Sequence, residues 1–436
     1  MARKIVSAIL PVLFCLIGFS VQAQKPVLNK YTFGEGLTFS SNDYALTFRG
    51  YAQPFSETTI YSDTSLDRNS YTRFRMRRLR LEISGDAVNE KIDYRLQVDL
   101  SGTPEVDLAN ATYLLDAWVS YNFTRRVKLA FGQKATPTDN RGLTVSSQSL
   151  QLVERSPLTS AFSTIREFGL FFQGDIRTKG GAYFKNYFTL TNGDGLNAFN
   201  ADHGGLKVGG RIDFLPFGLF SNLGQFREVD MMRELSPKLV IGVNASYNKG
   251  MSSRRGRESG AILYLNDSLQ ESLPDFSKVG IDLMFKYKGF SVLGEFVQTA
   301  ANVPDDITQR VRVDGTTSTV FDVDGVQDVE NYVKNRMMLG SGYNIQVGYI
   351  FKSLFSIDAR YTHLDADEYS FLRNGTFYNR PNTYALGVSK YLSRNYGVKI
   401  QASVSYVTLN EGSLDILGNP ISGHLILGHF LTSIAF

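Results

Sequence analysis

The most constraining feature of this 436-residue chain is an alternation of apolar and polar residues that recurs from residue 44 to the end. In residues 93–100, 206–214 and 398–406, nearly every second residue is apolar and the intervening residues are mostly polar. A period of two gives a β-strand one apolar and one polar face, and each of these runs is about ten residues long. Abundant Phe, Tyr and Gly (31, 23 and 39 residues) fit the same fold class. The sequence therefore predicts an all-β protein.

The first residues are typical of an export signal. Arg3 and Lys4 precede an apolar run over 5–19, and Val21-Gln22-Ala23 offers small residues for cleavage, so the mature chain is expected to start near Gln24. The run is shorter than the roughly 20 residues of a membrane-spanning helix, and no later stretch approaches that length. We expect a signal peptide over 1–23, an N-terminal periplasmic segment over 24–43 and a barrel domain over 44–436.

The number and spacing of the strands favour a barrel over a soluble sandwich. Sixteen strands are expected, an even number, as in bacterial single-chain outer-membrane barrels. They cover residues 44–54, 71–85, 91–101, 113–123, 126–134, 166–177, 182–191, 204–215, 238–249, 277–288, 289–299, 340–351, 354–363, 382–392, 396–409 and 423–436. Their connections alternate between short and long, which is typical of periplasmic turns and external loops. The pattern predicts a sixteen-stranded antiparallel transmembrane β-barrel in the bacterial outer membrane, in contact with its lipid.

One connection breaks the alternation. Residues 216–237 should form a periplasmic turn but are too many for one, and we interpret the part over 226–235 as a short helix that either plugs or flanks the base of the barrel.

The C-terminal strand and the aromatic residues agree with a membrane location. The chain ends in Phe436, which resembles the signal that the barrel-assembly machinery recognises in outer-membrane proteins. Aromatic residues also gather at strand ends, where interfacial girdles form. The candidates are Tyr121, Phe123, Tyr349, Phe351 and Tyr391.

One strand carries an unusual density of arginine. In residues 71–83 (YTRFRMRRLRLEI), apolar residues occupy even positions up to Met76 and odd positions from Leu79 onward. The change of parity at Arg77-Arg78 predicts a β-bulge that inserts one residue. An arginine facing lipid at mid-bilayer costs about 2–4 kcal/mol, so these arginines are expected to face the lumen.

Arginines and lysines on one inner wall would attract anions, because a guanidinium offers planar donors to an oxyanion. The predicted anion path consists of Arg73, Arg75, Arg77, Arg78, Arg80, Arg95, Lys128 and Lys134. The alternative is that the arginines pair with Asp93, Asp99 or Asp116 on neighbouring strands and only rigidify the wall. Both interpretations can hold together.

The long connection 135–165 contains Leu150, Leu152 and Val153, which are unexpected in a solvated loop. We expect it to fold inward as a constriction loop; the alternative is an external loop packed on its neighbours. Its polar candidates at the constriction are Arg141, Ser146, Ser147, Glu154 and Arg155, together with Asp139 and Ser149.

These segments resemble the phosphate-selective porin O and P family, most clearly over residues 45–215. The resemblance rests on 74–85 (FRMRRLRLEISG), 94–99 (YRLQVD), 116–121 (DAWVSY), 128–134 (KLAFGQK) and 150–155 (LQLVER). It implies a porin, commonly a homotrimer, that passes anions by diffusion along arginines and lysines. The family's phosphate-specific members carry lysines in the inward loop, whereas 135–165 has none. Anions, phosphate-like or not, or small polar solutes are therefore the expected cargo.

Other functions have less support. The charge balance of 46 basic and 42 acidic residues argues against a nucleic-acid partner. The four histidines lack metal-ligand spacing, and no cofactor motif is present. A non-enzymatic channel is expected. An outer-membrane lipid hydrolase would need a serine partner for His424 or His429, and none is evident. A structural or adhesion barrel acting through long loops is the weaker alternative.

Overall fold

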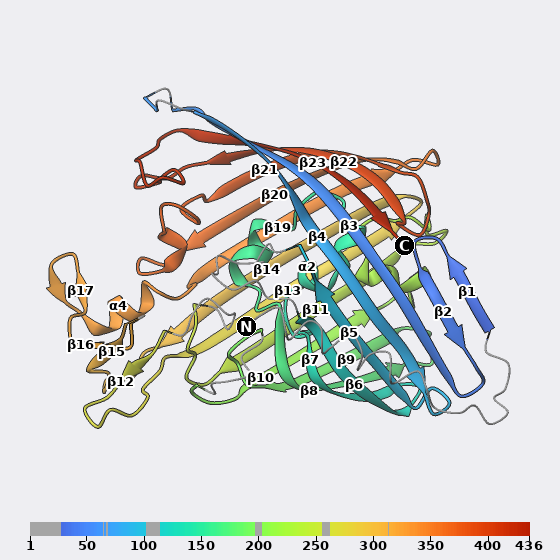
Figure 1. Ribbon diagram of the computed structural model, residues 1–436, viewed down its shortest axis with the longest axis horizontal. Helices are drawn as coiled ribbons and strands as arrows, with labels where there is room; N and C mark the ends of the chain where they lie inside the picture. The colour runs from blue at the N-terminus through green and yellow to red at the C-terminus, as the bar shows by residue number, and fades with distance from the viewer. Residues whose placement is uncertain are drawn as a thin grey trace, which may run out of the picture.

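The computed structural model describes residues 28–63, 65–66, 69–101, 114–196, 203–254, 262–312 and 314–436. The predicted signal peptide lies outside these residues. Sixteen antiparallel strands form a closed barrel (Figure 1). They are β3 (Tyr44–Tyr61), β4 (Ser70–Ala87), β5 (Ile92–Asp99), β6 (Leu114–Thr124), β7 (Val127–Ala135), β8 (Arg166–Arg177), β9 (Tyr183–Thr191), β10 (Lys207–Leu215), β11 (Lys238–Asn248), β13 (Asp275–Tyr287), β14 (Phe290–Asn302), β19 (Gly340–Ile350), β20 (Phe355–Ala366), β21 (Asn382–Tyr391), β22 (Val398–Thr408) and β23 (His424–Ala435). The predicted fold class is confirmed.

The barrel closes where its first and last strands meet. β23 pairs with β3 in antiparallel register, from Leu425 opposite Tyr61 to Ala435 opposite Tyr51. Phe436 and Gly50 then exchange two backbone hydrogen bonds of 2.8 and 2.9 Å. An N-terminal hairpin of β1 (Leu28–Thr32) and β2 (Gly36–Ser40), which the alternation did not predict, continues the sheet beside the start of β3. It lies at the end of the barrel that carries the short turns (Figure 1).

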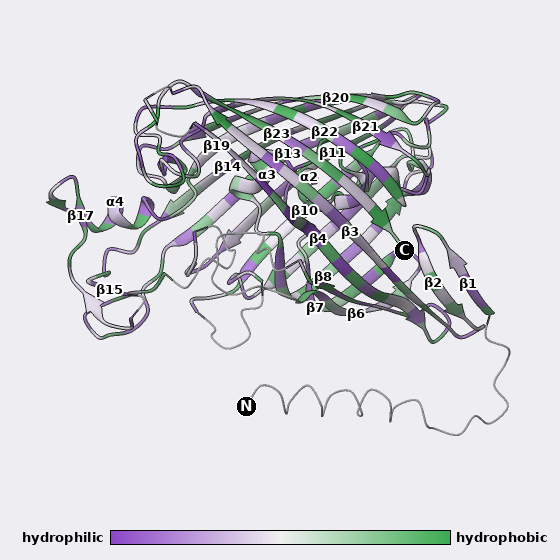
Figure 2. Cartoon of the chain, turned by 45° about the horizontal axis from the view of Figure 1, so that its top comes forward, coloured by the Kyte–Doolittle hydropathy of each residue, from purple (hydrophilic) through white to green (hydrophobic). Residues whose placement is uncertain are grey.

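Apolar and polar residues alternate along the strands of the wall, as the colours of Figure 2 show. Outward residues such as Val119, Phe131 and Leu386 are exposed, and most inward residues are buried. Of the predicted girdle aromatics, Tyr121, Phe123, Tyr349 and Phe351 are exposed at strand ends. Tyr391 is different, because it is 0% exposed and packs inside the barrel. Among the described residues, no helix is both long and apolar enough to cross a membrane.

The predicted bulge lies in β4. Gln53 of β3 pairs with Arg78 and Pro54 pairs with Met76, so Arg77 has no cross-strand partner. The extra residue restores the parity that places the arginines inside and Leu79 and Leu81 outside. Pro54 has no N–H to donate, and its place opposite the irregularity allows β3 to continue to Tyr61. This is why β3 is longer than predicted.

The connection between β7 and β8 folds into the barrel, which confirms the constriction loop and rejects the external alternative. It contains α2 (Arg141–Thr144), the 3₁₀ turn η1 (Ser147–Ser149) and α3 (Pro157–Phe162). Its apolar side chains fill the space beside the inner wall. Val145 and Leu150 pack with Leu215, Val240 and Met284, and further along the loop Leu158 and Phe162 pack with Val297 and Leu364.

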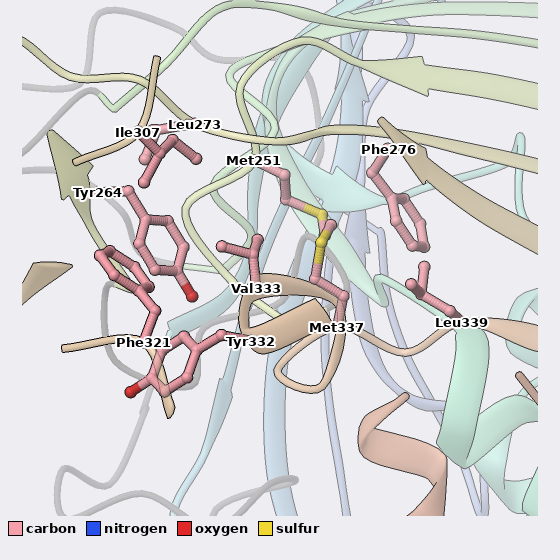
Figure 3. Close-up of a cluster of buried hydrophobic side chains, with 10 residues drawn as sticks. All are labelled: Met251, Tyr264, Leu273, Phe276, Ile307, Phe321, Tyr332, Val333, Met337 and Leu339. Atoms are coloured by element: carbon pink, nitrogen blue, oxygen red, sulfur yellow. The ribbon is translucent and has the colours of Figure 1, made fainter. Parts of the chain in front are cut away.

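At the long-loop end, two connections form a small satellite with its own core. Figure 1 shows it projecting from the barrel: β12 (Tyr264–Leu265), β15 (Gln309–Val311) and β16 (Thr317–Ser318) form a sheet, beside the β17 (Asp322–Val323) and β18 (Val326–Gln327) hairpin and α4 (Val329–Lys334). Ten buried residues, among them Phe321 and Tyr332, form its core (Figure 3). The rings of these two residues meet edge to face at 5.2 Å.

Replacing Phe321 by Ala should loosen this satellite without opening the barrel. Phe321 is 0% exposed, and deleting a buried phenyl ring costs about 3–5 kcal/mol. We expect trypsin to cleave Phe321→Ala within residues 303–339 faster than it cleaves the parent chain. The barrel fragment should keep its resistance, and the exposed Val320→Ala serves as the control. Equal cleavage of both variants would contradict an independent satellite core.

Candidate functional site

The constriction loop is anchored along one arc of the barrel wall. Asn140 and the Gly142 N–H donate to Glu295 of β14 at 2.8 and 2.6 Å. Further along the loop, the Leu150 carbonyl accepts from Lys399 and Gln401 of β22 at 3.3 and 3.0 Å. The loop therefore covers polar groups on the inner face from β10 round to β22. The arc from β3 to β8 faces the space that remains.

That space is a cavity of about 420 Å³ between the loop and the uncovered arc. Three carboxylates line it, from Glu35, Asp116 and Glu154. Eight arginines line it as well: Arg49, Arg77, Arg78, Arg80, Arg95, Arg155, Arg166 and Arg227. The lining thus carries five more positive than negative charges. Such a surface lowers the energy of an anion and raises that of a cation.

Nine of the fifteen candidate residues named from the sequence line this one cavity. Four come from the arginine wall and five from the loop: Arg77, Arg78, Arg80, Arg95, Ser146, Ser147, Ser149, Glu154 and Arg155. The wall and the loop meet at Glu154, whose carboxylate accepts from Arg77 at 2.5 and 3.1 Å and from Arg78 at 3.4 Å. Removal from bulk water raises the pKa of Glu154, but these two guanidiniums outweigh it and lower the pKa to about 2. Glu154 is therefore ionised at neutral pH.

Four predicted residues of the anion path lie outside the cavity lining. Arg73 and Arg75 both approach Glu57, at 3.5 and 3.6 Å, towards the long-loop end of β4. Lys128 pairs with Asp93 at 2.7 Å near the short-turn end. The Lys134 ammonium lies over the Trp118 ring, 4.8 Å from its centroid.

Arg141 differs from the expectation that it lines the opening. Its side chain is 0% exposed and faces the covered wall. There it contacts Asp213 at 2.7 Å and Asp282 at 2.8 Å, and Arg211 contacts the same two carboxylates at 2.8 and 2.7 Å. Two cations and two anions thus neutralise each other in a buried cluster. Arg141 attaches the loop to the wall.

Pairing within the arginine wall is extensive. Arg80 contacts Asp99 at 2.8 Å, and Arg95 contacts Glu82 at 2.6 Å and Asp116 at 3.2 Å. The pairing alternative from the sequence thus describes these contacts correctly. It does not neutralise the cavity, because the eight lining arginines outnumber the three lining carboxylates even when Glu82 and Asp99 are added to them. Arg95 stays 30% exposed and Arg77 17% exposed, so both reach water.

Sequence reasoning missed three lining arginines. Arg49 has the same strand parity as Tyr51 and Gln53, whose side chains are buried in the lumen, and this signal could have identified it. Arg166 begins β8 and contacts Asp116 at 2.8 Å. Arg227 belongs to the connection 216–237, for which no periodic pattern existed. Among the described residues, no group of three or more His, Cys, Asp or Glu is placed to hold a metal ion.

The profile of the phosphate-selective porin O and P family matches residues 58–319, more than half of the chain. This chain belongs to that family. It is an outer-membrane porin, and the short-turn end accordingly faces the periplasm. No curated protein matches its sequence.

Solved porins share the fold of this family member at low sequence identity. An anion-selective porin from Comamonas acidovorans superposes with a TM-score of 0.52 at 12% identity, covering 90% of this chain and all of the other. OmpF of Salmonella typhi, solved with daunomycin, gives 0.51 at 11% identity, with 94% and 100% covered. The DcaP channel of Acinetobacter baumannii gives 0.50 at 8% identity, with 91% and 99% covered. At these identities the likeness shows the barrel fold alone.

Proposed function

We propose that this porin is an anion-selective diffusion channel whose selectivity is set between the constriction loop and the arginine wall. The cavity lined by eight arginines and three carboxylates carries this proposal. Solutes pass by diffusion, and fixed guanidiniums raise the local anion concentration. The family and a structural neighbour described as anion-selective support the same direction.

Phosphate is one member of the proposed class, not its defining substrate. The loop offers Ser146, Ser147 and Arg155 at the cavity but no lysine. Small anions in general are therefore the proposed cargo, together with small polar solutes. Assembly as a homotrimer, and recognition of the exposed Phe436 by the barrel-assembly machinery, belong to the same proposal.

Reversal potentials in a planar bilayer test the proposed selectivity directly. With a tenfold KCl gradient across the bilayer, the potential should have the sign of chloride permeation. Selectivity should weaken as the salt concentration rises from 0.1 M to 1 M, because the screening length falls from about 10 Å to about 3 Å. Adding phosphate as a competing anion separates phosphate preference from general anion passage. A cation-selective potential would overturn the proposal.

A further inference from the structure

The connection 216–237 is not a turn at the rim. It is here called the periplasmic segment and is distinct from the N-terminal residues 24–43. It leaves β10 and returns to β11, the eighth and ninth strands counted from β3, so it starts half-way round the ring. The predicted helix over 226–235 is wrong. The helical part is the 3₁₀ element η2 (Ser221–Phe226), and Glu228 to Met231 are buried in a stretch of bends and turns without helix or strand.

The buried part of the periplasmic segment follows the inside of the rim past three successive turns. At the turn between β13 and β14, the Lys288 N–H donates to the Glu234 carbonyl at 2.9 Å. The next N–H, of Gly289, donates to the Asp230 carboxylate at 2.7 Å. Arg233 donates to the carbonyl of Ile350, the last residue of β19 before the turn to β20. Tyr396, between β21 and β22, donates its hydroxyl to the Val229 carbonyl at 3.3 Å. These contacts fix the segment inside the periplasmic mouth.

The same segment contacts the constriction loop from the periplasmic side. The Ser146 N–H donates to the Phe226 carbonyl at 3.1 Å, and the Gln151 N–H donates to Glu228 at 2.8 Å. The Arg141 guanidinium donates to the Gln225 carbonyl at 3.3 Å. The loop and the periplasmic segment therefore form one internal body that reaches the lumen from both ends of the barrel.

Four residues of the segment line the arginine-rich cavity: Asn222, Leu223, Phe226 and Arg227. Leu223 is 61% exposed, so its side chain reaches into open space. The Arg227 guanidinium lies over the Tyr396 ring, 5.2 Å from its centroid. In the part of the chain that the structure describes, Arg227 makes no ion pair with a carboxylate. Its charge is therefore not offset by contact, unlike that of Arg77 or Arg80.

We propose that the periplasmic segment is the second half of the selectivity constriction, and that Arg227 is a specificity-determining cation at its periplasmic exit. This proposal rests on the proposed anion channel. A permeating anion then passes the arginine wall on one side and Arg227 on a separate, internally braced element. Asn222 and Leu223 narrow the same exit.

Charge variants of Arg227 test its role in selectivity. Arg227→Gln should lower the anion-to-cation permeability ratio about fourfold in 0.1 M KCl. Arg227→Lys keeps the charge, so its anion-to-cation permeability ratio should stay within twofold of that of the parent. If Arg227→Gln leaves the reversal potential unchanged in a channel whose parent is anion-selective, the specificity role is wrong. If the permeability ratio of Arg227→Lys falls as far as that of Arg227→Gln, then packing on Tyr396 and not charge is responsible. That result also overturns the specificity role of Arg227.

A cysteine probe tests the position of the segment independently. Leu223→Cys should react with a negatively charged methanethiosulfonate reagent and lose at least half of its anion current. The parent chain, whose only cysteine is Cys15, is the control and should keep its current. Full modification without any change in current would overturn the placement of the segment in the path. A non-selective parent that is still blocked through Leu223→Cys would sink the proposed anion selectivity alone.

Discussion

Replacing Glu154 by Gln should raise the anion-to-cation permeability ratio, whereas Arg77→Gln should lower it. Each change alters the cavity by one charge, and a unit charge about 8 Å from the path contributes about 0.5 kcal/mol in water. The permeability of the anion therefore rises or falls about twofold, and the permeability of the cation changes by a similar factor in the opposite direction. Reversal potentials in 0.1 M KCl should therefore report changes of about fourfold in opposite directions.

The double variant Arg77→Gln/Glu154→Gln is the matched control. It removes one positive and one negative charge, so its cavity has the same net charge as the parent, and amide groups replace the ion pair at the same place. Its permeability ratio should return close to that of the parent. If both single variants shift selectivity in the same direction, the fixed charge of the cavity is not what selects the permeating ion.

Arg141→Ala should have the largest effect on stability. It leaves Asp213 and Asp282 buried with only Arg211 between them, and an uncompensated buried charge costs about 3–5 kcal/mol. The free energy of unfolding, measured by urea denaturation in lipid vesicles, should fall by this amount. The loop also loses its attachment to the covered wall, so the open-channel current should become larger and noisier.

A charge-balanced control separates charge from packing. Arg141→Gln/Asp282→Asn removes one cation and one anion and leaves the Arg211–Asp213 pair at 2.8 Å. Its free energy of unfolding should fall by less than half as much as that of Arg141→Ala. Equal losses in the two variants would show that the volume of the side chain, and not its charge, holds the loop.

The barrel itself could be predicted from local pattern, because alternation is a property of each strand alone. Most of the sixteen predicted strands coincide with observed ones within a few residues, and the parity change at Arg77 located the bulge. The β1–β2 hairpin and the short strands of the satellite were missed, because their two to five residues carry too little periodicity.

The site was only partly predictable, because the lumen is divided by contacts between distant segments. Parity placed Arg78 and Arg80 inside, but it could not decide which inward charges face water and which meet the loop. Arg141 was expected in the opening, yet its partners Asp213 and Asp282 lie 72 and 141 residues away in sequence. Arg227 lies on a segment without strand periodicity, whose position depends on the turns that surround it.

The distant anchors of the constriction loop also bear on the order of assembly. Its Leu150 carbonyl accepts from Lys399, 249 residues later in the chain. The wall closes only when β23, the sixteenth strand of the barrel, meets β3. The loop can therefore reach its final position only after β22 has been made, and contacts of such sequence separation form slowly. Maturation of the pore interior and closure of the seam should consequently be late, coupled events.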